Sequence, residues 1–203
     1  MYIAKGKRIE IYTLTVEHVY EMRKWGEHLD PLFEDYNFPK LSRTEAKQWF
    51  HIKTGERKKK CYGVLNENGR VIGYLTISNI KRIKRNAVLG IVLDPNYLNN
   101  GYGTETLKAF LDYYFNELKM KKMYLNVARF NKRAIRCYEK CGFEIAKEFS
   151  EKLENQNIPI FSDEFYKDIR YDFTLEEGEI YCYYYKMQLD KSKYNLIFNK
   201  NMV

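Results

Sequence analysis

The chain has 203 residues, of which 45% are hydrophobic and 16% aromatic, so its composition is that of a globular protein and excludes disorder as its main state. No apolar run reaches the roughly 18 residues that a membrane span needs, and the polar N-terminus lacks the apolar core of a signal peptide. We therefore expect one domain, residues 1–203, large enough to bury a substantial core.

Cysteine and histidine usage argues against a disulfide framework and against a metal site. The four cysteines, Cys61, Cys137, Cys141 and Cys182, form no CxxC pair, and the three histidines are scattered along the chain. We expect a reduced, cytoplasmic protein that binds no metal.

The net charge of +8 is spread unevenly along the chain. Between Glu151 and Glu179 there are nine acidic and three basic residues, so this segment carries −6 and the rest of the chain +14. A basic body favours an anionic partner and an acidic segment a cationic one, although solvated surface charge explains either pattern equally well.

The first half of the chain predicts one strand, two helices and a two-stranded hairpin. The alternating stretch Arg8–Leu14 is typical of a strand, and Thr15 is a suitable cap for a helix that runs to about His28. Ser42 and Glu45 have capping-box spacing ahead of a second helix, Thr44–Thr54. Two further strands flank the turn at Asn68-Gly69, within residues 60–78.

The second half predicts four more strands and two helices. A strand at 86–94 precedes a long helix, in which apolar residues from Leu107 to Leu118 recur at helical spacing. A strand at 122–130, a helix at 131–140 and a strand at 142–149 follow, and the last strand is 179–189. Residues 150–178 have no clear period and predict a loop with short helical pieces.

Two glycines, Gly101 and Gly103, stand where the long helix begins, although each weakens a first turn. A helix N-terminus presents unpaired N–H groups and the positive end of the helix dipole, and glycine lets a bulky anion approach the backbone. The stretch is therefore suited to a phosphate or pyrophosphate site, although a plain tight turn is the simpler explanation. A third glycine for a Rossmann fingerprint and a Gly-Lys-Ser/Thr sequence for a Walker loop are both missing.

The sequence around this stretch resembles the acyl-CoA-binding core of the GNAT N-acetyltransferase superfamily. The resemblance covers Asn86–Phe149 and is carried by strand–Asp-Pro–loop–Gly-x-Gly–helix, then Leu-x-Val followed by Asn131, then "CYEKCGF" at 137–143. It is greatest to the branch of ribosomal-protein N-terminal and spermidine acetyltransferases. It implies an α/β fold with a mixed sheet of about seven strands, about four flanking helices, and an acyl-CoA cleft between two splayed parallel strands.

The resemblance also implies roles for individual residues. Backbone groups of Ile91 and Leu93 would bind the pantetheine arm and thioester of acetyl-CoA, and Asn131 would hydrogen-bond the same arm, a role that can coexist with capping a helix. Tyr138 would be the general acid for the departing thiolate; the other explanation is that it is one core tyrosine among 19. The CoA pyrophosphate would lie on main-chain amides of Asn100, Gly101, Tyr102, Gly103 and Thr104.

The chain departs from the family pattern at three positions. Val88 occupies the place where relatives often have a glutamate base, Leu98 replaces a usual Gln or Arg, and Asn99 replaces a common glycine. A different route for deprotonating the amine is therefore expected, through water, backbone carbonyls or an acidic residue of the 150–178 segment.

The acidic segment is the best indication of the acceptor. It forms an insertion, 150–178, before the last strand, and its carboxylates Asp163, Glu164 and Asp168 are our candidates for attracting a cationic amine. A polyamine, an aminoglycoside-like amine and a protein or peptide N-terminus all remain open as acceptors. The Tyr-rich strand Tyr181–Tyr185 is compatible with a homodimer interface as well as with a core.

Two other readings compete with an acetyltransferase. One is a catalytically silent acyl-CoA-binding protein, which the loss of a glutamate at Val88 favours. The other is a nucleic-acid-binding module, suggested by the basic runs Arg57–Lys60 and Lys81–Arg85. Both runs flank predicted strands, where lysines normally solvate turns and protect edges, so we expect no nucleic-acid or membrane partner.

Overall fold

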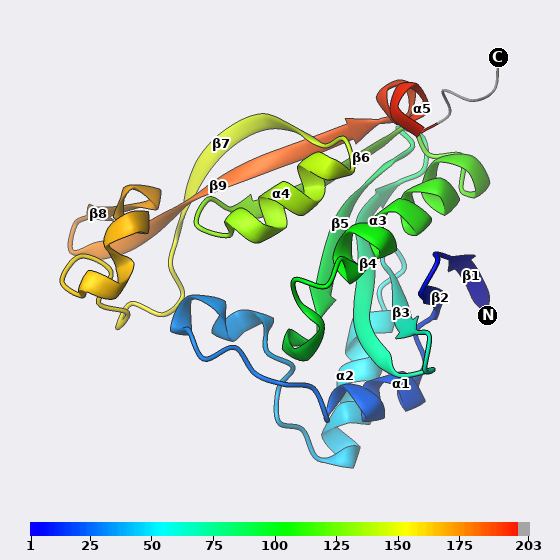
Figure 1. Ribbon diagram of the computed structural model, residues 1–203, viewed down its shortest axis with the longest axis horizontal. Helices are drawn as coiled ribbons and strands as arrows, with labels where there is room; N and C mark the ends of the chain where they lie inside the picture. Colours follow the sequence, from blue (N-terminus) through cyan, green and yellow to red (C-terminus); the bar gives the residue numbers. More distant parts are fainter. Residues whose placement is uncertain (199–203) are drawn as a thin grey trace. The chain divides into compact units, whose positions relative to one another are not determined.

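The computed structural model describes residues 1–198, which group into two compact units (Figure 1). The first unit comprises Met1–Met123 together with the segment from Asp190 on, and the second comprises Tyr124–Leu189. In the described residues there are nine strands and five α-helices, against about seven strands and four helices predicted. The prediction of a mixed α/β fold is confirmed, whereas a single domain and a cleft between two splayed strands remain predictions.

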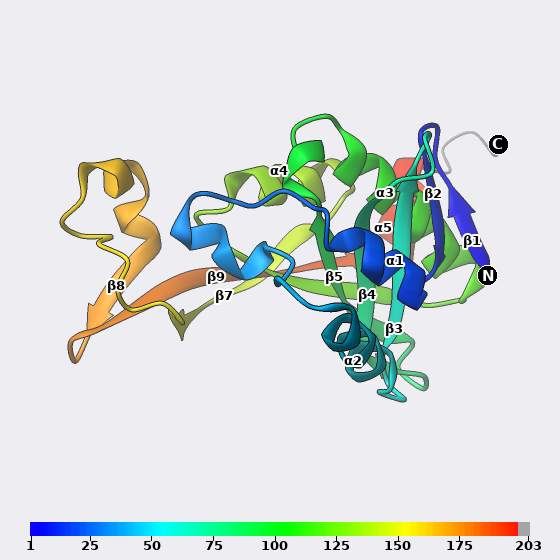
Figure 2. The same ribbon diagram turned by 90° about the horizontal axis from the view of Figure 1, so that it is seen from below.

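The first unit is built on five antiparallel strands that lie side by side in the order of the chain (Figure 2). They are β1 (Tyr2–Lys5), β2 (Ile9–Thr13), β3 (Lys60–Asn66), β4 (Val71–Lys81) and β5 (Asn86–Leu93). The predicted hairpin joins β3 to β4, with Gly69 in the left-handed conformation (φ 71°) that the Asn-Gly turn favours. Strand β1 was not predicted.

Helices cover both faces of these strands. Successive side chains of a strand point to opposite faces. Cys61 of β3 packs in the cluster that contains Val19 and Ala46, whereas the ring of the next residue, Tyr62, lies 5.0 Å from that of Phe110. The helices of the first unit are α1 (Val16–Met22), α2 (Arg43–Thr54), α3 (Tyr102–Asp112) and α5 (Lys191–Phe198), and its shorter helical turns are η1 (Pro31–Tyr36), η2 (Pro95–Tyr97) and η3 (Tyr113–Glu117).

The predicted helix starts are confirmed, whereas the ends of α1 and α3 differ from the prediction. Ser42 and Glu45 form the predicted capping box of α2. Helix α1 begins after Thr15 as predicted but ends at Met22 rather than near His28, since Trp25 turns into the core and donates its indole N–H to Val71 O at 2.8 Å. Helix α3 ends at Asp112 and continues as the π-helical turn η3 instead of running on to Leu118.

The second unit contains four strands, one α-helix and one 3-10 segment within the described chain. They are β6 (Lys122–Ala128), α4 (Lys132–Lys140), β7 (Glu144–Lys152), η4 (Glu164–Asp172), β8 (Phe173–Glu176) and β9 (Glu179–Asp190). Strand β9 is central: β6 and β7 flank it, and β8 pairs with its first residues. The predicted loop at 150–178 does hold a helical piece, but β8 was missed. Helix α5, which follows β9, was missed as well.

Candidate functional site

The loop between β5 and α3 is held in place by a buried carboxylate, Asp94. Its Oδ1 accepts hydrogen bonds from Asn96 N and from Gly26 N, both at 3.0 Å. Its Oδ2 makes no hydrogen bond and lies 3.8 Å from Nη2 of Arg70. The Asp-Pro signature thus fixes where the strand ends and also anchors the segment that follows α1.

Beyond Asp94 the chain makes a turn that only a permissive backbone allows. Asn99 and Gly101 both have positive φ, 62° and 82°. Gly101 is the N-cap of α3, and it makes no side-chain cap hydrogen bond. Asn99, Asn100 and Gly101 are all exposed, so the positive end of the α3 dipole faces solvent at this loop. We call residues 98–104 the glycine loop.

A cation that sequence reasoning missed lies on the glycine loop. Arg8 donates from Nη2 to Asn100 O at 3.1 Å, and its guanidinium lies 4.4 Å from the ring centre of Tyr102. Its Nε donates to Glu105 Oε2 at 3.0 Å, and its backbone N–H donates to Oε1 of the same residue. Arg8 therefore places a guanidinium, paired with Glu105, beside a helix N-terminus, and both groups are donors that suit phosphate oxygens.

Ile91 and Leu93 are half-buried near the end of β5, opposite Leu75 and Gly73 of β4. Gly73 permits a close approach here, because a Cβ on it would lie 2.5 Å from a methyl carbon of Leu93. In the first unit the structure thus brings together the strand end, the glycine loop and the first turn of α3.

In the second unit, Asn131 is the N-cap of α4 and Tyr138 lies within the helix. Asn131 is buried and caps the helix, accepting from Ala134 N at 3.1 Å. Tyr138 is 8% exposed, and its ring meets that of Phe143 edge to face at 5.9 Å. Asn131 therefore has the capping role that the sequence allowed. The catalytic role of Tyr138 and the CoA role of Asn131 remain predictions.

The three candidate acceptor residues lie on or beside the exposed segment η4. Asp163 caps η4 by accepting from Phe165 N at 2.9 Å, and Asp168 is exposed. Glu164 is 77% exposed and pairs with Arg170 at 3.5 Å. All three carboxylates are accessible from solvent, as attraction of a cationic amine requires.

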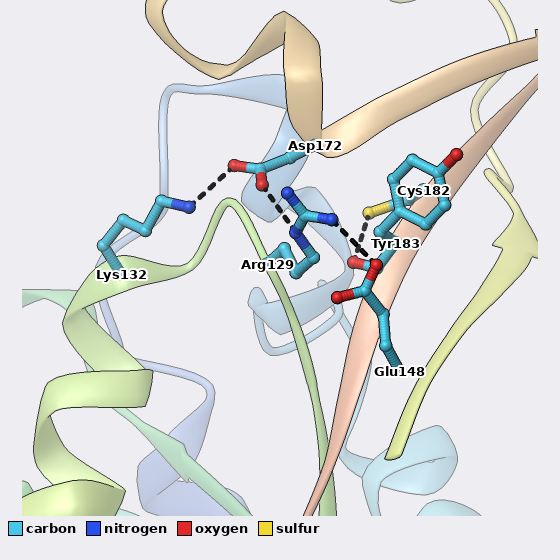
Figure 3. A network of polar contacts seen from close by, with 6 residues as sticks. All are labelled: Arg129, Lys132, Glu148, Asp172, Cys182 and Tyr183. Atoms are coloured by element: carbon cyan, nitrogen blue, oxygen red, sulfur yellow. Dashed lines mark hydrogen bonds and ion pairs between the residues drawn. The ribbon is translucent and has the colours of Figure 1, made fainter. Parts of the chain in front are cut away.

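A fourth carboxylate of this segment, Asp172, is fully buried and was not singled out by the sequence (Figure 3). Its two oxygens accept hydrogen bonds from Arg129 Nε at 3.0 Å and from Lys132 Nζ at 2.9 Å. Arg129 also donates from Nη1 to Glu148 at 2.9 Å. Burial alone would lower the pKa of Lys132, but the hydrogen bonds to Asp172 and Tyr171 and the charge of Asp172 together outweigh it, so the net pKa is raised. The cluster ties the end of η4 to the start of α4.

The described residues 1–198 contain no helix long and apolar enough to cross a membrane. Over the same range, no three His, Cys, Asp or Glu side chains gather as metal ligands would, and no cysteine forms a disulfide.

Comparison with known proteins agrees with this geometry. Residues 8–144 match the family profile described as Acetyltransferase (GNAT) domain. Spermidine N(1)-acetyltransferase of Vibrio cholerae is 29% identical over 105 residues, which are 52% of this chain and 61% of that protein. The Escherichia coli K12 enzyme of the same name is 33% identical over 85 residues, 42% of this chain and 46% of its own length. The matched region thus spans about half to three fifths of these relatives.

A solved structure shares the fold at lower identity. The crystal structure of spermidine N-acetyltransferase from Vibrio cholerae in complex with CoA and spermine superposes with a TM-score of 0.66 at 20% identity, covering 92% of this chain and 97% of that one. Since the family profile covers more than half of the chain, the chain belongs to the GNAT acetyltransferase family.

Proposed function

We propose that this protein is an N-acetyltransferase that moves an acetyl group from acetyl-CoA to a primary amine, with a polyamine of the spermidine type as the favoured acceptor. The observation that carries the proposal is the glycine loop at the N-terminus of α3. In this loop Gly101 has a positive φ and Arg8 donates to Asn100 O, and the chain belongs to the GNAT family. The named relatives that act on spermidine support the choice of acceptor.

The glycine loop has the properties that the pyrophosphate of CoA requires. The amides of residues 100–104 and the guanidinium of Arg8 would hold the phosphates, and β5 would offer backbone groups of Ile91 and Leu93 to the pantetheine arm. A Cβ on Gly101 would lie 3.4 Å from Arg8 Nη2, an ordinary contact, so the left-handed backbone (φ 82°) rather than lack of space is what favours glycine here. CoA would supply the activated acetyl thioester.

Substituting Gly101 with alanine is expected to weaken CoA binding about tenfold and to destabilise the fold by about 1–2 kcal/mol, because the left-handed conformation disfavours a Cβ. Calorimetry with CoA and thermal unfolding measure the two effects. Gly69→Ala is the matched control, because Gly69 has φ 71° with nothing within 4 Å of an added Cβ. Equal CoA affinity in both variants would remove the glycine loop from the site.

The chemistry needs a neutral amine and a proton for the departing sulfur. Tyr138 would supply that proton, because a phenol group can act as a general acid. Because Val88 offers no carboxylate, we infer that the proton of the attacking amine leaves through water or to an acidic residue of the 150–178 segment, with backbone carbonyls positioning the water by hydrogen bonds.

Release of free thiol from acetyl-CoA in the presence of spermidine, spermine, an aminoglycoside and N-terminal peptides tests the proposal. We expect turnover with the polyamines. Turnover with the peptides alone would leave the reaction class standing and replace the acceptor. CoA binding without turnover on any amine would identify a silent acyl-CoA-binding protein.

Replacing Asp163, Glu164 and Asp168 with their amides is expected to raise the KM for spermidine and to leave the Kd of CoA unchanged, because three accessible negative charges near a cationic substrate are lost. Asparagine can still cap η4 at position 163, so the fold should persist. Steady-state kinetics at low salt measure the effect.

The control replaces Glu117, Glu139 and Glu144, three exposed acids outside the segment, with glutamine. A KM that is unmoved in the first variant, or moved equally in both, would leave the segment as ordinary solvated surface.

A further inference from the structure

Two basic runs that lie apart in the sequence converge on one cavity in the first unit. The cavity has a volume of about 890 Å³. It is lined by three cations of the run Arg57–Lys60, by four of the run Lys81–Arg85, and by Lys119. Its apolar lining comes from isoleucines of β4 and of the hairpin after it, and from Leu118 and Met120. No lining residue is acidic.

Backbone hydrogen bonds hold these segments together, so the cavity is a built feature. The register of β4 and β5 shifts between Ser78 and Lys81, and Ile80 N donates to Lys58 O at 3.2 Å. The carbonyl of Arg85, a residue with φ 49°, accepts from the N–H groups of Lys121 and Lys122 at 2.7 and 3.2 Å. The two runs and the segment after η3 are therefore fixed side by side.

The cations of the cavity are not neutralised by the protein. Within residues 1–198, none of the eight forms an ion pair with a carboxylate, whereas their neighbour Lys59 does pair, with Glu56. Eight like charges around one concavity repel one another, and a bound anion would relieve this repulsion.

We propose that this cavity binds a ligand that carries several phosphate groups. A phosphate monoester brings about −1.5 to −2 charges at pH 7 against −1 for a carboxylate, so a polyphosphate concentrates the negative charge that eight cations call for within a small volume. The guanidiniums of Arg57, Arg82 and Arg85 offer bidentate geometry for phosphate oxygens. No lining residue is aromatic, which disfavours a single-stranded nucleic acid held by base stacking.

The cavity is separate from the glycine loop. Both belong to the first unit, at opposite ends of β5. Asn86, beside the cavity, and Leu93, beside the loop, are about 23 Å apart at 3.3 Å per residue. A ligand in the cavity therefore does not compete with CoA for its proposed place.

The test is calorimetric titration of the full chain with inorganic tripolyphosphate, first without CoA and then in saturating CoA, which fills the glycine loop. We expect binding that weakens about tenfold in the variant Lys58→Gln, Arg82→Gln, Lys84→Gln, whose three side chains are exposed. The control variant Lys24→Gln, Lys40→Gln, Lys47→Gln removes three exposed charges elsewhere and should bind as the parent does.

Absence of binding to the parent protein, or equal weakening in both variants, would overturn the proposal. Capture of single-stranded RNA without affinity for tripolyphosphate would overturn it too. Flotation with phosphatidylcholine vesicles, with and without phosphatidylserine, separates the two sources of phosphate. Capture by the anionic vesicles that tripolyphosphate reverses assigns a lipid headgroup, and tripolyphosphate binding without capture assigns a free ligand.

Discussion

Replacing Tyr138 with phenylalanine is expected to lower kcat by about 10²–10⁴-fold, because the thiolate that leaves acetyl-CoA would lose its proton donor. The ring that packs against Phe143 is kept, so the fold and the Kd of CoA should be nearly unchanged. A phenol of ordinary pKa near 10 is matched to a thiol whose pKa is near 8.5, and phenylalanine has no proton to give. Single-turnover release of thiol, measured with spermidine, isolates the chemical step.

Tyr181→Phe provides the matched control, since Tyr181 is a half-buried tyrosine of β9 in the same unit. It should retain kcat. A loss of less than threefold in Tyr138→Phe, or an equal loss in both variants, would show that Tyr138 is only a packing residue of α4.

Replacing Asp172 with alanine is expected to destabilise the protein by about 3–5 kcal/mol, because two cations would lose the buried anion that neutralises them. The carboxylate is fully buried, and the side chains of Arg129 and Lys132 are 18% and 40% exposed. Partial access of water to Lys132 places the expected cost toward the lower end of this range. Denaturant unfolding measures the change, and faster proteolysis within η4 would locate it.

Glu148→Ala is the comparison variant, because Glu148 pairs with the same guanidinium but is 45% exposed. Its removal should cost about 0–1 kcal/mol, as at other exposed pairs. If both substitutions cost the same, burial would not be what makes the Asp172 contacts strong.

The elements that the sequence predicted well are those whose signals are local. The capping box at Ser42, the Asn68-Gly69 turn and the start of α3 each depend on residues a few positions apart. The end of α1 was wrong because a tertiary contact decides it, whereas the chain after α3 stays helical as the π-turn η3. Helix α1 stops at Met22 because the indole of Trp25 is buried and donates a hydrogen bond to Val71 O of β4. Strands β1 and β8 are four residues each, too short for a period to be read.

The candidate site divides in the same way. The glycine loop could be recognised because its residues are contiguous. Arg8 could not, since it lies 92 residues before the carbonyl to which it donates. Asp172 looked like any of the nine acids of its segment, and burial alone distinguishes it. The two basic runs were visible in the sequence, but their convergence depends on the bulge in β4.

The carboxylate of Asp94 gives two loops a common fixed point. Its Oδ1 accepts hydrogen bonds from two backbone N–H groups. One belongs to Gly26, 68 residues earlier in the chain, and the other to Asn96, two residues before the glycine loop. Neither loop can shift far without breaking a bond at the shared atom. The turn that precedes α3 and the segment after α1 therefore share one hydrogen-bond acceptor, and displacement of either segment costs a bond at the same atom.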